Sequence, residues 1–387
     1  MEYVIVSPNF PPQNDPEAFC AARAANALTK EGHIVHVITL CTEQQLSKNI
    51  TNELCGDKLD IHYVAVPNLK ISKTAIRWRF FKTALLYRFY CDCPEYIKPL
   101  IAETKKLLLQ HPNSILITRA IPFYSHYIGY KCYKYAKKWV AHFSDPVPPA
   151  TVECSRLAKY LGKFDILWLK KIFEKSNIIE VTCRPVIEYF CRIVGDKYRL
   201  KFIVAYHLAL PQLNTNGIKP IIEVEKEKTL VHVGFLSGKR FGMLKKALPY
   251  IKSKGWSVLQ YGQCNIPKGE FEALENFQVI KPNSFSPELS TWIYQHATCN
   301  LIIDTPSDLS YSPYLPSKFA YAIVANRPVF VIGIQKSEMS MLHKQYGGFG
   351  IWYENIHDDE NFLNNPIQPG ESLYKCFVAE SNMIKSY

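Results

Sequence analysis

The sequence has 387 residues, more than a single domain core usually holds, so two α/β domains are expected. Hydrophobic residues make up 48 % and charged residues 21 %, a globular balance that excludes a disordered or fibrous chain. Lysine and arginine number 46 against 34 acidic residues, which gives a formal net charge of +12. Such an excess suits a phosphorylated ligand, an anionic membrane surface or nucleic acid.

Twelve cysteines are scattered along the chain, with no CxxC pair and no Cys/His cluster at the spacing of a zinc site. We interpret them as reduced, mostly buried thiols, and we predict neither a metal nor a cofactor. The opening residues lack the basic segment and long apolar core of a signal peptide. No run reaches the ~18 to 20 apolar residues of a spanning helix, so a cytoplasmic protein is expected.

The first half opens with a strand–helix–strand pattern. Glu2 to Val6 is a short β-branched run typical of a buried strand. Asp15-Pro16-Glu17 is a helix-start signal, and this helix should end at Gly32 before a second strand. Further strands are expected at 33–40, 60–66, 114–118, 138–143, 178–182 and 201–205. This succession predicts a Rossmann-like domain with a parallel sheet over residues 1–205.

The second half repeats this organisation after a linker. Residues 206–228 carry several Pro, Asn and Gly residues and are expected to form a hinge. A strand at 229–234 leads into a helix from about Arg240, and more strands are expected at 257–261, 299–303 and 328–333. A second Rossmann-like domain is therefore predicted over 229–365, and a C-terminal helix within 366–387 should pack back on the first domain.

The stretch from Lys70 to Tyr90 alternates basic and bulky apolar residues at helical spacing. Such a helix can lie in a membrane interface, so contact with an anionic membrane on its inner face is one expectation. An ordinary domain helix with a solvated basic face is the alternative. Nucleic acid is not predicted, because no recognition motif accompanies the charge.

Ligands of parallel α/β sheets bind beside the carboxyl ends of the strands, and anions bind at the helix N-termini that follow. In the first half this rule selects the loop that contains Asn14 and Asp15, and the segment His142-Phe-Ser-Asp145-Pro146. Asp145 followed by prolines predicts a rigid polar lip, although a turn-forming or capping role would explain it equally.

In the second half the same rule selects two loops. The segment from Gly234 to Arg240 combines two glycines, Gly234 and Gly238, with adjacent cations, Lys239 and Arg240, at a helix start. A diphosphate needs this combination of backbone N–H groups, dipole and point charge. The other loop begins at Asp304, directly after a strand, and leads into a helix whose first residues are Ser317 and Lys318.

These segments resemble glycosyltransferase family 4, in particular its bacterial surface-polysaccharide branch. The opening Val6-Ser-Pro-Asn-Phe-Pro-Pro12 and the helix that ends before Gly32-His33 look like the start of these enzymes. His142-Phe-Ser-Asp-Pro146 is similar to their Ser-Asp-Pro loop. Gly238-Lys-Arg240 and Tyr314-Leu-Pro-Ser-Lys-Phe319, followed by Asn-Arg-Pro-Val, resemble their donor segments. The blocks occur in the family's order and span about residues 1 to 355.

The resemblance implies a GT-B fold, in which two Rossmann-like domains with parallel sheets face a central cleft. It implies a retaining, metal-independent hexosyltransferase, with a nucleotide-sugar donor bound by the second domain and a lipid-linked or oligosaccharide acceptor bound by the first. Lys239 and Arg240 would neutralise the leaving diphosphate, the role that a metal has elsewhere. Ser317 and Lys318 would add donors to the same phosphates.

The remaining roles also follow from the resemblance. Asp145 would face the reacting sugar or the acceptor hydroxyl, and His142 is a second candidate because it lies on the same strand face as Ser144. Asp304 would orient the donor sugar or its own loop. Tyr321 occupies the position where the family usually has an acid that binds the nucleotide ribose. A tyrosine can hydrogen-bond a ribose but carries no charge.

Two other functions stay open on the sequence. A nucleotide-sugar epimerase of GT-B fold would act on the donor alone and would need no basic, apolar docking segment at 70–90. A non-catalytic glycosyltransferase-like protein would bind a nucleotide sugar without turnover, and the absent ribose acid and loop glycines motivate this alternative.

Overall fold

A computed structural model describes residues 1–13, 15–41, 59–65, 94–150, 156–209, 215–272, 274–282, 286–307, 309–354 and 361–378, without the side chains of 156–163. Asn14 and the basic, apolar stretch Lys70–Tyr90 lie outside these residues. The chain divides into two units, the first over Met1–Tyr206 and the second beginning at His207. In the described part, no helix combines the length and the apolar character that a membrane span requires.

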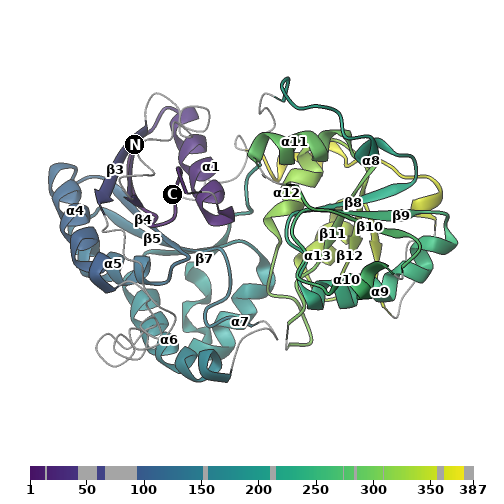
Figure 1. Cartoon of the computed structure of the whole chain (residues 1–387). Coiled ribbons are helices and arrows are strands. Elements are labelled where there is room, and N and C mark those ends of the chain that lie inside the picture. Colours follow the sequence, from purple (N-terminus) through teal and green to yellow (C-terminus); the bar gives the residue numbers. More distant parts are fainter. Residues whose placement is uncertain are drawn as a thin grey trace. The chain divides into compact units, whose positions relative to one another are not determined.

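The first unit is built on a seven-stranded sheet in the order β3-β2-β1-β4-β5-β6-β7 (Figure 1). Every neighbouring pair of strands is parallel. The strands are β1 (Glu2–Val6), β2 (Ile34–Cys41), β3 (Leu59–Ala65), β4 (Ile115–Ala120), β5 (Lys138–Phe143), β6 (Ile178–Val181) and β7 (Phe202–Val204). The order reverses between β1 and β4, and ligands of open α/β sheets bind beside the carboxyl ends at such a switch point.

Helices connect these strands as parallel pairing requires. The α-helices are α1 (Pro16–Lys30), α4 (Ile97–Gln110), α5 (Tyr124–Cys132), α6 (Arg156–Lys175) and α7 (Arg184–Val194), with short 3-10 turns η1 (Pro94–Tyr96), η2 (Tyr133–Tyr135) and η3 (Asp196–Lys201). Asp15 caps α1, since its Oδ1 accepts the N–H of Ala18 at 3.0 Å. The Asp-Pro-Glu start signal is confirmed, and the side chain of Asp15 is occupied by this cap.

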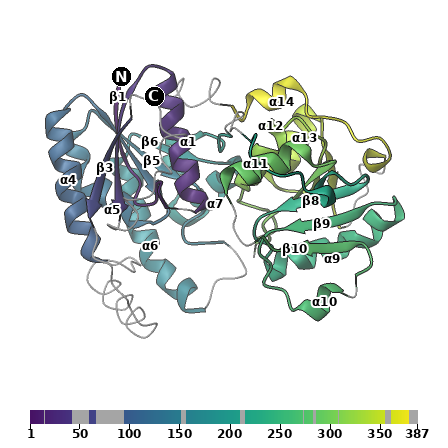
Figure 2. The same ribbon diagram turned by 45° about the horizontal axis from the view of Figure 1, so that its top comes forward.

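The second unit holds a six-stranded parallel sheet in the order β10-β9-β8-β11-β12-β13, of which Figure 2 labels β8, β9 and β10. Its strands are β8 (Thr229–Val233), β9 (Ser257–Tyr261), β10 (Phe277–Ile280), β11 (Cys299–Ile303), β12 (Val329–Ile332) and β13 (Gly350–Trp352). Its helices are α8 (Ile222–Glu225), α9 (Gly238–Ser253), α10 (Lys268–Glu272), α11 (Pro287–His296), α12 (Ser317–Val324), α13 (Glu338–Tyr346), η4 (Phe362–Asn364) and α14 (Glu371–Lys375).

Residues of β8, β11 and β12 share one apolar core with α9, including the fully buried Leu244, Ile251 and Phe330. Two strands at the sheet edges, β10 and β13, were not predicted from the sequence. The C-terminal helix is shorter than expected, whereas the expected packing of the C-terminal segment on the first domain stays a prediction. The helix ends at Lys375 and contacts α12 and α13 of its own unit, while residues 379–387 lie outside the described part.

Candidate active site

The loop after β8 is shaped by two glycines with positive φ. Gly234, at φ +94°, donates its N–H to the carbonyl of Tyr261 at 2.7 Å. Gly262 follows β9 at φ +135°, and a Cβ atom there would collide with the backbone of Gly234. Only glycine accommodates both the conformation and the close approach. The loops after β8 and β9 therefore pack backbone against backbone at the carboxyl edge of the sheet.

Helix α9 begins in this loop with the two predicted cations in its first turn. The Oγ of Ser237 caps the helix by accepting the N–H of Arg240 at 3.5 Å. The guanidinium of Arg240 donates from Nη2 to the Oγ1 of Thr305 at 2.6 Å, so it points to the loop after β11. Lys239 is half-exposed. The helix start thus combines a positive dipole end with one arginine held in place and one neighbouring lysine.

Lys318 reaches the same loop from the first turn of α12. Its Nζ donates to the carbonyl oxygen of Phe235 at 3.4 Å, and a Cβ atom on Gly234 would come within 3.1 Å of it. Burial, together with the positive charge of Arg240, lowers the pKa of Lys318 to about 7. No carboxylate of the described residues lies within ion-pair distance of Lys318. The β8 loop therefore brings two cations together beside neutral oxygen acceptors.

Asp304 organises the loop that receives Arg240. It follows β11 and is completely buried, and its Oδ1 accepts the N–H of Thr305 at 2.7 Å and the hydroxyl of Ser312 at 2.9 Å. Burial raises its pKa to about 6, although these hydrogen bonds oppose the shift. The carboxyl group holds Thr305 where Arg240 contacts it. Of the two roles expected for Asp304, this geometry favours orientation of its own loop.

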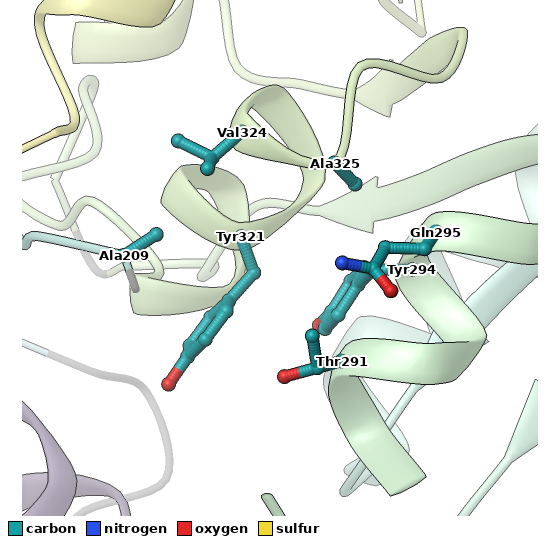
Figure 3. A pocket seen from close by; sticks show the side chains of 7 residues that line it. All are labelled: Ala209, Thr291, Tyr294, Gln295, Tyr321, Val324 and Ala325. Atoms are coloured by element: carbon teal, nitrogen blue, oxygen red, sulfur yellow. The ribbon is translucent and has the colours of Figure 1, made fainter. Parts of the chain in front are cut away.

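Tyr321 lies one turn after Ser317 on α12 and lines a small pocket of the second unit (Figure 3). Its ring stacks on that of Tyr294 from α11, with ring centres 5.6 Å apart and planes 6° apart. The pocket is completed by Ala209, Thr291, Gln295, Val324 and Ala325. The position that the resemblance assigns to the ribose thus carries an aromatic pair, and it shares a helix with Ser317 and Lys318.

In the first unit, His142 lies at the carboxyl end of β5 in a buried polar network. Its Nδ1 is 2.6 Å from the Oε1 of Glu180, and its Nε2 is 3.3 Å from the Oγ of Ser144. Burial raises the pKa of Glu180 to about 7, against the opposing charge of Arg119. His142 itself is only 3 % exposed. Both ring nitrogens of His142 lie within hydrogen-bond distance of protein side chains, so the ring is placed to orient the hydroxyl of Ser144 and not to contact solvent.

The network continues from Ser144 to the start of α1. The Oγ of Ser144 lies 2.8 Å from the Oε2 of Glu17 and 3.1 Å from the carbonyl oxygen of Ala120, and a hydroxyl donates to one of them at a time. Arg119 pairs with the other oxygen of Glu17 at 3.3 Å. Asp145 follows Ser144 and is half-buried. Sequence reasoning missed Glu17 and Arg119, because single residues in a helix turn and a strand give no local signal.

No protein-family model and no curated protein matches the sequence. Solved structures do match over nearly the whole chain. TarM of S. aureus, in complex with UDP, has a TM-score of 0.60 at 9 % identity and covers 94 % of this chain and 93 % of its own. The catalytic domain of starch synthase IV from Arabidopsis thaliana, bound to ADP and acarbose, has a TM-score of 0.52 at 12 % identity, with coverages of 85 % and 82 %.

A third similar structure is AviGT4, a glycosyltransferase involved in avilamycin A biosynthesis. Its TM-score is 0.52 at 10 % identity, and the match covers 97 % of this chain and 91 % of that one. These likenesses establish the fold. The chain consists of two Rossmann-like units with parallel sheets, the GT-B architecture that the sequence resemblance implied.

Proposed function

We propose that this chain is a glycosyltransferase of family 4 type that binds a nucleotide-sugar donor with its second unit and an acceptor with its first. The observation that carries the proposal is that Arg240 lies in the first turn of α9 and Lys318 contacts the loop that leads into this helix. Similar structures of the same fold are complexes with UDP or ADP, which supports a nucleotide ligand here. A fold does not by itself define an activity, so the proposed activity rests on the residues of this site.

A diphosphate fits the chemistry of the β8 loop. The N-termini of α9 and α12 both contribute free N–H groups and a positive dipole end. Arg240 and Lys318 supply two further positive charges, and Lys239 lies in the first turn of α9. An anion bound there would relieve the repulsion that lowers the pKa of Lys318. Gly234 leaves room for the ammonium group of Lys318, and Gly262 leaves room for the backbone of Gly234, so both glycines shape this loop.

The transfer step then needs little beyond charge stabilisation. The bond between the anomeric carbon and the β-phosphate oxygen breaks, and the nucleoside diphosphate leaves with that electron pair. The acceptor oxygen forms the new glycosidic bond, and its proton passes to an oxygen of the leaving diphosphate. Lys239, Arg240 and Lys318 stabilise the charge on the leaving diphosphate, which would make the reaction independent of metal. We propose retention of anomeric configuration on the strength of the family resemblance.

On the acceptor side we assign direct contact to Asp145 and a positioning role to His142. Asp145 is half-buried at the carboxyl end of β5, whereas His142 is bonded on both ring nitrogens. His142 therefore orients Ser144, and Glu17, which is paired with Arg119, accepts a hydrogen bond from the same hydroxyl. The resemblance favours a lipid-linked or oligosaccharide acceptor in surface-polysaccharide assembly, with the protein at the inner face of a membrane.

A thermal-shift screen of nucleoside diphosphates and nucleotide sugars tests donor binding. A ligand at 100 times its Kd should stabilise the folded chain by about 2.7 kcal/mol through mass action. Lys318→Ala should lose most of the shift, whereas Lys246→Ala, an exposed lysine paired with Glu354, should keep it. The absence of a shift with every nucleotide in the wild-type protein would refute the proposal.

Product analysis then separates the remaining functions. A transferase releases nucleoside diphosphate and glycosylates an acceptor. An epimerase changes the donor without any acceptor, and a binding protein shows a thermal shift with no release. The membrane expectation has its own test: replacing Trp78, Phe80 and Phe81 with Ser should release the chain from anionic liposomes, and unchanged co-sedimentation would contradict it.

A further inference from the structure

A second cluster of titratable side chains lies in the first unit, far along the strands from the residues discussed above. His36 of β2 and Asp60 and His62 of β3 project from one face of the sheet, because His36 pairs with Asp60 and His62 follows two residues later. Glu2, on β1, lies on the same face. All four residues except His62 belong to the amino half of their strands, whereas His142 to Asp145 mark the carboxyl edge.

Helix α4 packs on this face of the sheet and contributes two further side chains to the cluster. It contacts β1, β2 and β3, and it runs beside them in both views (Figures 1 and 2). Glu103, from the middle of the helix, places Oε1 3.5 Å from Nδ1 of His62. His111, at its C-cap, places Nδ1 2.8 Å from Oε1 of Glu2. Three imidazoles and three carboxylates thus lie close together, although the chain as a whole has a net charge of +12. Lys106 also contacts this cluster, with its Nζ 3.1 Å from Oε1 of Glu103.

We infer that Asp60, His36 and His62 bind a divalent transition-metal ion of the Zn²⁺ class, with water in the fourth position. Asp60 Oδ2 lies 3.1 Å from Nδ1 of His36 and 2.8 Å from Nε2 of His62, and the three atoms all lie within 4.8 Å of one another. Ligands 2.0–2.1 Å from a tetrahedral zinc ion stand about 3.3 Å apart. The two nitrogen–oxygen distances therefore need to lengthen by only a few tenths of an ångström, while the two nitrogens, which lie within 4.8 Å of each other, must approach to the same separation.

The surroundings of both histidines support this ligand set. A metal-bound imidazole usually donates its other N–H to a carboxylate, which fixes the tautomer and strengthens the ligand. Nε2 of His36 lies 3.3 Å from Glu2, and Nδ1 of His62 faces Glu103. With neutral imidazoles the three carboxylates carry three negative charges, which a divalent cation offsets better than the single ammonium of Lys106 does.

An alternative set shares His36 and uses Glu2 and His111. We favour the first set because both of its histidines have a carboxylate at the outer nitrogen, and because adjacent paired strands hold its ligands rigidly. The ion would tie β2 to β3 and, through Glu103, to α4. Its role is stabilisation of the first unit, separate from the proposed transfer chemistry at the opposite edge of the sheet.

The test is isothermal titration of the EDTA-treated, dialysed full-length chain with ZnCl₂, repeated with CoCl₂ to record the visible absorption of a tetrahedral cobalt site. We expect one saturable site, a higher melting temperature with zinc, and at least about tenfold weaker binding in His36→Asn and His62→Asn. Glu103→Gln should weaken binding about tenfold, as loss of an outer-shell carboxylate does. His111→Asn and the distant His343→Asn should bind as the wild type does.

Three results would overturn the inference. Absence of saturable binding in the wild-type chain would remove the site. Full binding by His62→Asn together with loss in His111→Asn would place the ion in the alternative set. Equal loss in His343→Asn would mean binding elsewhere. Circular dichroism checks that each variant folds, and the nucleotide-induced thermal shift, measured after EDTA treatment, should be unchanged, so failure here is distinguishable from failure of the proposed function.

Discussion

The two units handle charge in opposite ways at the carboxyl edges of their sheets. In the first unit Arg119 pairs with Glu17, and His142 lies within hydrogen-bond distance of Glu180, so buried polar groups meet partners of the same unit. In the second unit Arg240 and Lys318 gather around neutral oxygens, and the positive charge of one lowers the pKa of the other. The first arrangement joins its polar groups to partners of the same unit. The second would gain an opposite charge from the phosphates of the proposed donor.

The largest expected effect comes from removing cations of the second unit. Lys239→Ala combined with Arg240→Ala should reduce turnover about 10²-fold or more, by analogy with the loss of transition-state anion stabilisers. Steady-state kinetics with the donor found by the thermal-shift screen measures this. Lys245→Ala with Lys246→Ala is the matched control, because both lysines are exposed on the same helix. Wild-type-like turnover in the first double variant would remove the phosphate role.

The pH dependence of diphosphate binding tests whether the second unit lowers the pKa of Lys318. The pKa of Lys318 is about 7 in the free protein, so above this pH a bound anion must draw a proton onto the amine. Between pH 7.5 and about 9 the affinity should fall by up to roughly tenfold per pH unit, because one proton is taken up. Calorimetry in buffers of different ionisation enthalpy detects that proton directly.

Lys318→Arg is the informative partner variant, since a guanidinium stays protonated throughout this range. It should bind the diphosphate with an affinity that is nearly independent of pH, and without proton uptake. A wild-type affinity that is constant between pH 7.5 and 9 would show that Lys318 is already protonated without ligand. The charge contrast between the two units would then be smaller than proposed.

A smaller effect is expected from the internally paired network. Burial raises the pKa of Glu180 from 4.5 to about 7, so the folded state favours the protonated carboxyl. This contribution to stability is complete below the unfolded value of 4.5 and is lost as pH rises through 7. Glu180→Gln keeps a neutral hydrogen-bonding group, so its melting temperature relative to wild type should rise by a few degrees between pH 5 and pH 8.

Glu188→Gln serves as the control for that measurement, because Glu188 is exposed and paired with Arg199. Its difference from wild type should change little over the same pH range. If the melting-temperature difference between Glu180→Gln and wild type also changes little with pH, the carboxyl of Glu180 stays ionised beside a charged His142. The first unit would then hold a buried ion pair in place of a shared proton.

Most strands and helices were predicted from short-range patterns in the sequence. The strand that ends at Val233, the glycines after it and the helix from Gly238 are contiguous, so periodicity and turn chemistry place them correctly. The edge strands β10 and β13 were not predicted, because only the first residue of β10 is buried and β13 is the tripeptide Gly-Ile-Trp, so neither forms a buried β-branched run. The helix at Glu371 stops early at Lys375, although no glycine or proline follows to mark its end.

The candidate site was predictable only in part. Lys239, Arg240 and Lys318 belong to segments with recognisable spacing, and in the structure Arg240 contacts the loop after β11 while Lys318 contacts the loop after β8. Glu17 meets Ser144 across 127 positions of sequence, and no spacing rule reaches that far. The same limit hid the histidine–carboxylate cluster around His36, whose members share nothing but register between strands.

The packing of Gly262 on Gly234 has a consequence for random mutagenesis. A methyl group at 262 would push the neighbouring loop outward as a unit, and with it the carbonyl of Phe235 that anchors Lys318. Residue 262 carries no charge and no side chain. Selection for variants that no longer bind the nucleotide should nevertheless yield substitutions of Gly262, in addition to substitutions of Lys239, Arg240 and Lys318.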